Sequence, residues 1–258
     1  MKKSMSKKIV TTHSGGMDSA VLLYMASETV TENDTPGEVH TVTFDYNQRH
    51  NRELDCVNLQ LTNAKEKYHH VSFYNKLLDV KYIKDIAPVS SLTNNDIDTP
   101  NVNEVMGEAQ PRTYVPYRNM MFLSILLSYA EAIGADEVWY GAAQADSLAG
   151  YWDGSEDFVK KINKVTSLNR ENKITVHAPL IEMSKEDIIR TGVNLGVNFA
   201  DTYTCYSGEY PCDAESASSA LRLKGFIEAG FKDPLKYKQQ EKLNKIYKDK
   251  NCIDIITE

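Results

Sequence analysis

The sequence predicts an α/β protein in which a five-stranded parallel sheet carries helices on both faces, with a small helical region at the C-terminus. Short apolar runs alternate with helical patterns along most of the chain, and such alternation is typical of a parallel sheet covered on both sides. A length of 258 residues, with 41% apolar and 25% charged residues, is sufficient for one sizeable domain. A glycine pair after the first apolar run marks a strand-to-helix turn.

Five apolar segments are expected to form the strands. Glu38–Tyr46 is the clearest of them because it is rich in β-branched residues. The five expected strands cover residues 7–14, 38–46, 68–75, 136–143 and 174–180. In a parallel sheet the ligand crevice lies at the carboxyl ends of the strands, so residues that follow these segments are the first candidates for a site.

Helical patterns fill the intervals between the strands. The segment that starts at Arg118 is strongly apolar and is expected to be a buried helix that ends at Gly134. Ser184 opens another helix with a capping signal. The expected helices cover residues 17–29, 49–67, 118–134, 155–164 and 184–196.

Two further features complete the expected organisation. Residues 92–112 are rich in Asn, Asp and Pro and are too long for a plain connector, so they are a candidate lid. Beyond Cys205 the chain is polar and helical. We therefore expect an α/β domain over residues 1–204 and a helical extension, packed on it, over residues 205–258.

Charge and cysteine content exclude several classes of protein. A formal net charge of −7 disfavours a nucleic acid held on a broad basic patch, but not a small anion in a locally positive pocket. The four cysteines include no CxxC pair, and low cysteine use suits a reducing compartment. No apolar run has the length of a membrane span or a signal sequence. We expect a soluble, cytoplasmic protein without direct nucleic-acid or membrane partners.

The stretch SGGMDS, Ser14–Ser19, has the composition of an anion site. Gly15 and Gly16 allow close approach of the backbone, and the first amides of the next helix have no partner within that helix. The two serines can donate hydroxyl hydrogen bonds, and Asp18 can cap the helix or hold Mg²⁺. The Walker and GxGxxG phosphate patterns are absent from the chain. The alternative is a turn whose Ser and Asp side chains only cap the helix.

SGGMDS resembles the pyrophosphate loop of the ATP pyrophosphatase superfamily. These enzymes split ATP into AMP and pyrophosphate and thereby activate a carbonyl oxygen by adenylation. The resemblance implies a Rossmann-like fold of the adenine nucleotide alpha hydrolase type, with the β- and γ-phosphates of ATP bound at the loop. It assigns ATP binding to Ser14, Gly15, Gly16, Met17, Asp18 and Ser19.

Further segments narrow the resemblance to one family. TFDYNQRH at residues 43–50 is similar to a strand-two segment written FDYGQRH, and VPYRN at residues 115–119 is similar to VPGRN. AGYWDGSEDFVKKIN at residues 149–163 is similar to a substrate loop, GYPDCRxxFxxxxN, and APLIEMSKEDII and TYTCYSG follow in the expected order. The patterns to which these segments are similar are those of the 7-cyano-7-deazaguanine synthase family. The resemblance implies conversion of 7-carboxy-7-deazaguanine and ammonia into 7-cyano-7-deazaguanine with ATP and Mg²⁺, by a homodimer.

The resemblance also assigns residues outside the loop to the nucleotide and to catalysis. Arg49 would stabilise the charge of the adenylate; a surface ion pair is its alternative role. Lys185 lies in the first turn of a helix, an unfavourable place for a cation, which suggests a phosphate contact. Residues implied in catalysis are Ser14, Asp18, Ser19, Arg49 and Lys185, and residues implied in nucleotide binding beyond the loop are Asp45, Arg118, Asn119 and Gly141.

Gln48, Asp146, Tyr151 and Asp153 are assigned to the deazaguanine substrate. A carboxylate can accept two hydrogen bonds from a guanine-like N1–H and exocyclic amine, and a tyrosine can stack on the ring. A polar surface loop is the alternative for the residues after the fourth strand. His13 and His50 are weaker candidates for proton transfer, because a lone histidine is more often packed or solvated.

The sequence departs from the family pattern at a zinc site that the family builds from four cysteines. Cys205 matches the first of them, but Asp213, Ser216 and Ser219 stand at the other three positions, and Cys212 is one residue out of register. Two serines are poor zinc donors, so we expect no structural zinc and name no metal ligand.

VPYRN and YWDGS differ from the family pattern, so the identity of the carboxylate that ATP activates stays open. An ATP-dependent ligase that stops at 7-amido-7-deazaguanine, or that uses another carboxylate, is the main alternative. A tRNA thiolase is disfavoured by the net charge and by the lack of paired catalytic cysteines. The intact SGGMDS loop disfavours a binding module without activity.

Overall fold

The computed structural model describes residues 6–31, 36–46, 52–94, 96–98, 111–205 and 210–255. A five-stranded sheet in the order β3-β2-β1-β4-β5, with every pairing parallel, forms its centre. The strands are β1 (Lys8–Thr12), β2 (Glu38–Asp45), β3 (Ser72–Asp79), β4 (Glu137–Trp139) and β5 (Thr175–His177). This confirms the predicted fold class.

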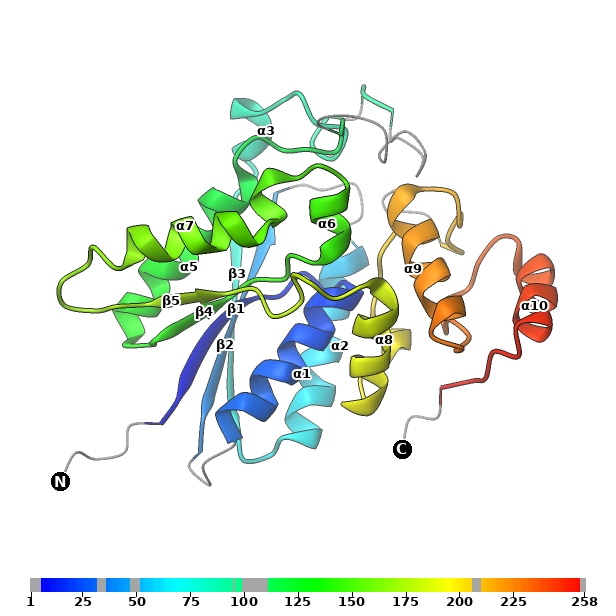
Figure 1. Cartoon of the computed structure of the whole chain (residues 1–258), viewed down its shortest axis with the longest axis horizontal. Helices are drawn as coiled ribbons and strands as arrows, with labels where there is room; N and C mark the ends of the chain where they lie inside the picture. Colours follow the sequence, from blue (N-terminus) through cyan, green and yellow to red (C-terminus); the bar gives the residue numbers. More distant parts are fainter. Residues whose placement is uncertain are drawn as a thin grey trace.

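Helices cover both faces of the sheet (Figure 1). One layer contains α1 (Met17–Thr31), α2 (Arg52–Lys67) and α8 (Lys185–Asn194), and the other contains α5 (Arg118–Ile133) and α7 (Glu156–Thr166). Short helices lie in the connections, namely α3 (Ile83–Ile86), α6 (Gln144–Leu148), η1 (Trp152–Gly154) and η2 (Phe199–Asp201). The C-terminal region adds α9 (Ala217–Glu228), which packs on α8, and α10 (Gln240–Asp249).

The alternation of side chains along β1 creates two apolar cores. Ile9 packs with the core under α1 and α8, whereas Val10 packs with the core under α5. Both residues are fully buried, as expected for a central strand of a parallel sheet. A third apolar cluster, which includes Tyr203, Leu243 and Tyr247, joins the C-terminal helices to the rest of the chain.

The order of the strands places a crevice beside β1. The chain runs outward from β1 to β2 and β3 on one side, and to β4 and β5 on the other. Connections that leave β1 and β4 therefore diverge, and ligands bind in the crevice that such a reversal opens. The SGGMDS loop follows β1 directly and thus lies at this position.

The bounds of three strands were predicted wrongly, and one of them is the fifth strand, which was expected at residues 174–180 but spans only Thr175–His177. The third strand was expected at residues 68–75 but spans Ser72–Asp79, because the Tyr68 amide donates to Ala64 and caps α2 while the Tyr68 side chain enters the core. The fourth strand is shorter than expected, because only Glu137–Trp139 pairs with both neighbours.

Helix α5 is less buried than its composition predicts. Only Leu123, Leu126 and Ala130 are buried, whereas Met120, Ser124 and Ser128 face solvent. The helix ends where predicted, since Gly134 adopts φ 67° and its amide donates to Ala130 and Glu131.

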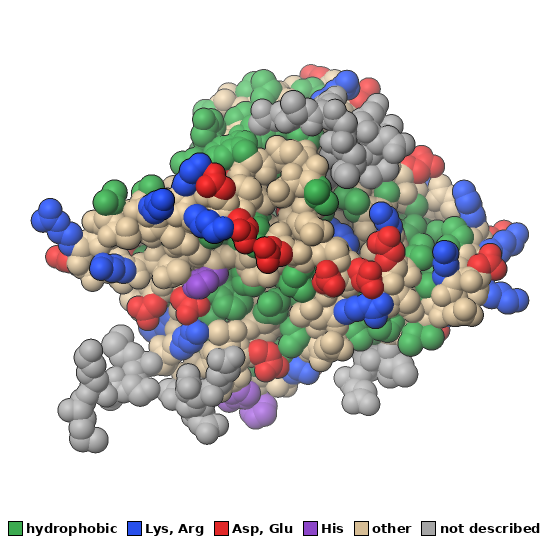
Figure 2. All heavy atoms as spheres, viewed as in Figure 1, with side chains coloured by type: hydrophobic (Ala, Val, Ile, Leu, Met, Phe, Trp, Pro, Cys, Tyr) green, Lys and Arg blue, Asp and Glu red, His purple; other side chains and the backbone are tan. Residues whose placement is uncertain are grey.

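The candidate lid at residues 92–112 lies largely outside the described residues. Its two ends are held together, because the Ser91 amide donates to the carbonyl of Arg112 at 2.9 Å. Within the described part of the chain, no helix combines the length and apolar character needed to cross a membrane. The face shown in Figure 2 mixes acidic and basic side chains rather than gathering one sign of charge.

Candidate functional site

A pocket of about 240 Å³ opens at the carboxyl ends of β1 and β4. The loop after β1 forms one wall, and the start of α5 with the segment after β4 forms the opposite wall. Apolar side chains from β2 and α5 line it, together with the charged side chains of Asp18, Glu53, Arg118 and Asp146. The pocket thus combines an apolar wall with an anion loop; among its lining residues are Ser14, Gly16, Met17, Asp18, Ser19, Val42, Phe44, Arg118, Asn119, Phe122, Gly141, Asp146 and Thr204.

Gly15 gives the loop its shape. It adopts φ +88°, a left-handed conformation that L side chains rarely adopt. A Cβ at this position would lie 1.8 Å from the backbone oxygen of Glu53 in α2. The sequence predicted a close approach of this backbone to an anion, but the structure shows that the glycine also permits close packing of the loop on α2.

Two loop amides point at hydroxyl oxygens. The Gly16 amide donates to Ser14 Oγ at 3.2 Å, and the Met17 amide donates to Thr204 Oγ1 at 3.3 Å. Ser19 Oγ donates to the Gly16 carbonyl at 3.0 Å, which holds the turn against the start of α1. These long amide–hydroxyl contacts are weaker than the charge-assisted bonds that a phosphate oxygen would make to the same amides.

Lys185 places a positive charge beside the loop. Its Nζ donates to Asp18 Oδ2 at 2.5 Å, and the side chain is 17% exposed. Burial alone would lower the pKa of Lys185, but the charges of Asp18 and Asp146 raise it above its ordinary value. The lysine is therefore charged at neutral pH. Ser184 caps α8 with the reciprocal capping box that the sequence predicted and so fixes the backbone next to this lysine.

Two carboxylates flank the lysine. Asp146 lines the pocket and accepts a hydrogen bond from the Ala143 amide at 2.8 Å. Burial raises the pKa of Asp146, Lys185 opposes this shift, and repulsion from Asp18 adds to it. Asp18 Oδ1 is buried and has no hydrogen-bond partner within the described part of the chain. This oxygen is the kind of hard donor that Mg²⁺ accepts.

The start of α5 brings predicted nucleotide-binding residues to the pocket. Arg118 and Asn119 both line it, and Arg118 Nη1 donates to the Tyr46 hydroxyl at 3.5 Å. Gly141 lines the pocket from the segment after β4. Asp45 does not line it; its carboxylate instead forms an ion pair with Lys81 at 2.9 Å.

The predicted substrate residues are separated by the structure. Asp146 faces the pocket, whereas Tyr151 and Asp153 are not among its lining residues. The Tyr151 hydroxyl forms a hydrogen bond with Thr113 Oγ1. Asp153 is 2% exposed; burial raises its pKa, and the positive charge of Arg118 opposes the shift. Gln48, Arg49 and His50 lie outside the described residues.

Sequence analysis missed Thr204 and Glu53, both of which line the pocket. Thr204 is 187 residues from its partner Met17, so no local pattern could place the two together. Its position next to Cys205 in the segment TYTCYSG was the only available signal. Glu53 lies in the first turn of α2, on the same buried face as Val57 and Leu61, and the sequence analysis considered only the apolar residues of that face.

His13 is buried beneath the loop and is not suited to proton transfer at neutral pH. Burial lowers its pKa to about 4, and the backbone near Ser19 and Val57 offsets only part of this effect. Since the unfolded histidine titrates near pH 6.5, the unfolded state binds more protons between pH 6.5 and pH 4. The free energy of unfolding is therefore not reduced by His13 above about pH 6.5, and it decreases as the pH falls from 6.5 towards 4.

We expect His13→Gln to remove this part of the acid sensitivity. From pH 7 to pH 4 the wild-type protein should lose about 3 kcal/mol more unfolding free energy than the variant. Urea unfolding at pH 7, 5.5 and 4.5 measures the difference. His69→Gln, at an exposed position, is the control and should retain the wild-type slope. Parallel curves for wild type and His13→Gln would contradict the prediction.

The residues at the expected zinc positions partly gather, but their donors do not suit zinc. Cys205 Sγ lies 3.9 Å from Ser216 Oγ, and Ser216 Oγ donates to Ser219 Oγ at 3.0 Å. The Asp213 carboxylate accepts the amides of Glu215 and Ser216. Among the described residues no group of three His, Cys, Asp or Glu side chains could hold a metal ion. The Cys212 thiol also contacts Cys205, but two thiols and two hydroxyls do not form a zinc site, and the absence of zinc stays a prediction.

Comparisons with known proteins agree on one family. Residues 8–230 match the family model described as "Queuosine biosynthesis protein QueC". A 7-cyano-7-deazaguanine synthase from Clostridium kluyveri is 37% identical over 241 residues, which cover 91% of this chain and 100% of that protein. A synthase of the same name from Methanoregula boonei is 39% identical over 230 residues, which cover 89% of this chain and 99% of that protein.

Proposed function

This chain belongs to the QueC family of queuosine biosynthesis proteins, and on that premise we propose that it is an ATP-dependent C–N ligase. Its substrates would be 7-carboxy-7-deazaguanine and ammonia, and its product 7-cyano-7-deazaguanine. The observation that carries the proposal is the loop Ser14–Ser19, which contributes to a pocket with an apolar wall, together with the charged Lys185, which does not line the pocket itself but pairs with Asp18 of the loop. This arrangement suits a ligand with a polyanionic end and a planar apolar end.

The triphosphate of ATP fits the charged side of the pocket. Phosphate oxygens would replace the Ser14 and Thr204 hydroxyls as acceptors for the Gly16 and Met17 amides. Lys185 would release Asp18 and pair with phosphate, which leaves the Asp18 carboxylate free to hold Mg²⁺. The metal would supply charge neutralisation for the departing pyrophosphate.

The apolar wall suits a heterocyclic base. Phe44 and Phe122 are stacked with their ring centroids 3.9 Å apart, and both line the pocket with Val42. Arg118 and Asn119 lie between this wall and the loop, where they could contact the base or the phosphates. Of the carboxylates assigned to the deazaguanine, Asp146 is better supported than Asp153, because only Asp146 lines the pocket.

The chemistry requires two activations. In the first, a carboxylate oxygen of the acid attacks the α-phosphorus of ATP and pyrophosphate leaves; ammonia then displaces AMP and gives the amide. In the second, the amide oxygen attacks the α-phosphorus of another ATP, pyrophosphate leaves and one N–H proton is lost; elimination of AMP with the remaining N–H proton then gives the nitrile. The residues of the site bind, orient and neutralise charge in both, and these are the effects expected to dominate catalysis here.

Mass spectrometry of the reaction products tests the proposal. Purified protein would be incubated with ATP, MgCl₂, ammonium and 7-carboxy-7-deazaguanine, beside a Ser14→Ala/Asp18→Ala control. A nitrile that depends on ATP and is absent from the control supports the proposal. Amide alone would favour a ligase that stops halfway, as the altered YWDGS segment allows. If no AMP forms with this acid, the substrate assignment is wrong.

We expect Lys185→Ala to reduce kcat/KM by about 100-fold, since one lost charge contact to a transition state typically costs that much. Part of the loss should appear as weaker ATP binding, because Asp18 then faces the phosphates without its counter-ion. Steady-state kinetics measure both effects. Lys160→Ala, which removes an exposed lysine paired with Glu156, should leave the kinetics unchanged. Equal kinetics for the two variants would exclude a role for Lys185.

We propose that the protein acts in the cytoplasm as a homodimer. Its four cysteines are unpaired and buried, which supports a reducing compartment. We also propose that residues 1–204 form the ATP-binding domain and residues 205–258 a packed extension. The extension contacts the domain through α8 and α9 and through the buried Arg222. Light scattering after size-exclusion chromatography tests the dimer.

A further inference from the structure

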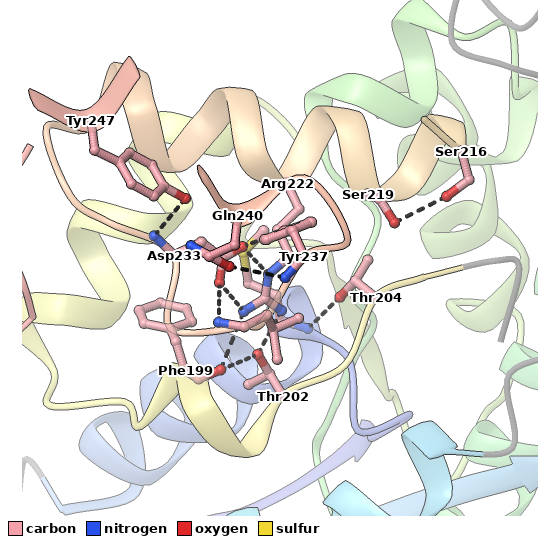
Figure 3. A network of polar contacts seen from close by, with 12 residues as sticks. Phe199, Thr202, Thr204, Ser216, Ser219, Arg222, Asp233, Tyr237, Gln240 and Tyr247 are labelled. Carbon is pink, nitrogen blue, oxygen red and sulfur yellow. Dashed lines mark hydrogen bonds and ion pairs between the residues drawn. The ribbon is translucent and has the colours of Figure 1, made fainter. Parts of the chain in front are cut away.

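A buried arginine in the C-terminal extension lies at the centre of a polar network (Figure 3). Arg222 of α9 is 1% exposed. Its Nε and Nη2 donate to the two carboxylate oxygens of Asp233 at 2.7 and 3.0 Å. Burial alone would lower the pKa of the guanidinium, but Asp233 raises it, so the guanidinium is charged. Bidentate geometry of this kind fixes both side chains.

The same guanidinium also donates hydrogen bonds to a segment of the α/β domain. Nη1 donates to Thr202 Oγ1 at 2.7 Å, and Nη2 donates to the Phe199 carbonyl at 3.2 Å. Thr202 Oγ1 in turn donates to the Phe199 carbonyl at 2.8 Å. Arg222 thus holds the first residue of η2 and the first residue after it.

The residues that follow directly contact the phosphate loop. The Tyr203 amide donates to the Gly15 carbonyl at 3.2 Å, and Thr204 Oγ1 accepts the Met17 amide at 3.3 Å. Gln60 adds a third contact, since its Nε2 donates both to the Gly15 carbonyl at 2.7 Å and to the Asp201 carbonyl at 2.9 Å. The segment 199–204 therefore connects Arg222 to the loop through consecutive residues.

We propose that Arg222 is a positioning residue for the phosphate loop. By fixing Thr202 it sets the positions of Tyr203 and Thr204, and these determine where the Gly15 carbonyl and the Met17 amide lie. The arginine touches no substrate and acts through this segment. The geometric part of the proposal is independent of the ligand; only the effect on ATP rests on the function proposed above.

The Met17 amide reports the geometric part in the ligand-free protein. Two-dimensional NMR of wild type and Thr202→Val would record its chemical shift and its hydrogen-exchange rate. Thr202→Val nearly keeps the volume of the side chain and replaces with a methyl group the hydroxyl that accepts from Arg222 and donates to the Phe199 carbonyl. We expect a shifted Met17 resonance and exchange at least about five-fold faster, because the Thr204 acceptor is displaced.

Two further variants separate positioning from general loss of stability. Arg222→Lys, which cannot reproduce the fork to Asp233 together with the contact to Thr202, should move the same amide further. Leu243→Ala creates a cavity in the C-terminal cluster around α10 and should lower the melting temperature without moving the Met17 resonance. The proposal is overturned if Thr202→Val leaves this amide unchanged, or if Leu243→Ala moves it equally.

Calorimetric titration with ATP then tests the effect on the ligand. Thr202→Val should weaken ATP binding about ten-fold. In steady-state kinetics the loss should appear in the KM for ATP and not in kcat, since the segment holds the loop and not the reacting atoms. If wild type binds no ATP, the proposed function fails, but the Met17 result still decides the positioning role. If the amide moves and ATP affinity is unchanged, Arg222 does not position the loop for its ligand and the proposal is wrong.

Discussion

Gly15→Ala is expected to lower kcat/KM by about 100-fold or more, because displacement of a binding loop by about 1 Å can cost this much. The new Cβ would lie 1.8 Å from the Glu53 carbonyl oxygen, a distance that no rotamer change can relieve, because the backbone of residue 15 fixes the Cβ and the oxygen belongs to the backbone of Glu53. The loop must therefore move away from α2. Its contacts to Gln60 and Tyr203 at the Gly15 carbonyl would be lost with that movement.

Gly134→Ala is the matched control for this prediction. Gly134 also has a left-handed backbone, with φ +67°, but no atom lies within 4 Å of the position of its added Cβ. This variant should lower the free energy of unfolding by about 1–2 kcal/mol, because alanine disfavours the left-handed backbone, and it should retain activity. ATP titration and steady-state kinetics on both variants, with urea unfolding beside them, separate the two effects. Similar activity losses would mean that backbone strain, and not the clash with Glu53, is responsible.

The sequence predicted the fold class because its strands and helices carry strong local signals. Alternating apolar runs and helical patterns require no knowledge of distant contacts. The boundaries of β3 were missed for the opposite reason. Tyr68 and Val71 are apolar and aromatic residues that suit a strand, but tertiary packing uses both side chains to close the end of α2.

The candidate site likewise contains residues that a local motif predicts and residues that only a distant contact brings to the site. Ser14, Gly16 and Asp18 were predicted from one contiguous motif at a strand-to-helix turn, and all three line the pocket. Lys185 was singled out because a cation is unfavourable in the first turn of a helix, and the structure supplies the compensating charge in Asp18. Thr204 could not be found, since its role exists only when the C-terminal segment folds back on the loop.

The residues after β4 show that similarity of a whole segment does not place each of its residues in the pocket. The resemblance grouped Asp146, Tyr151 and Asp153 as one substrate surface, yet only Asp146 lines the pocket. Asp153 is instead buried, and burial raises its pKa while Arg118 opposes the shift.

Asp233→Ala is expected to lower the free energy of unfolding by about 3–5 kcal/mol, because it leaves the buried Arg222 cation without its counter-ion. Asp233 accepts two hydrogen bonds from Arg222 and one each from the Tyr237 hydroxyl and the Leu235 amide. Arg222 would retain only Thr202 and the Phe199 carbonyl as partners. A loss of this size is a large fraction of the stability of an ordinary domain.

Asp254→Ala provides the comparison for Asp233, since it removes an aspartate from an ion pair in the same region that is exposed to solvent. Asp254 pairs with Lys232 at 2.9 Å, but its side chain is 79% exposed, whereas that of Asp233 is fully buried. The expected loss for this surface pair is below about 1 kcal/mol. Urea unfolding of both variants at pH 7 measures the contrast. Equal losses would show that burial does not set the contribution of the Arg222–Asp233 pair, and would remove the basis for regarding it as the anchor of segment 199–204.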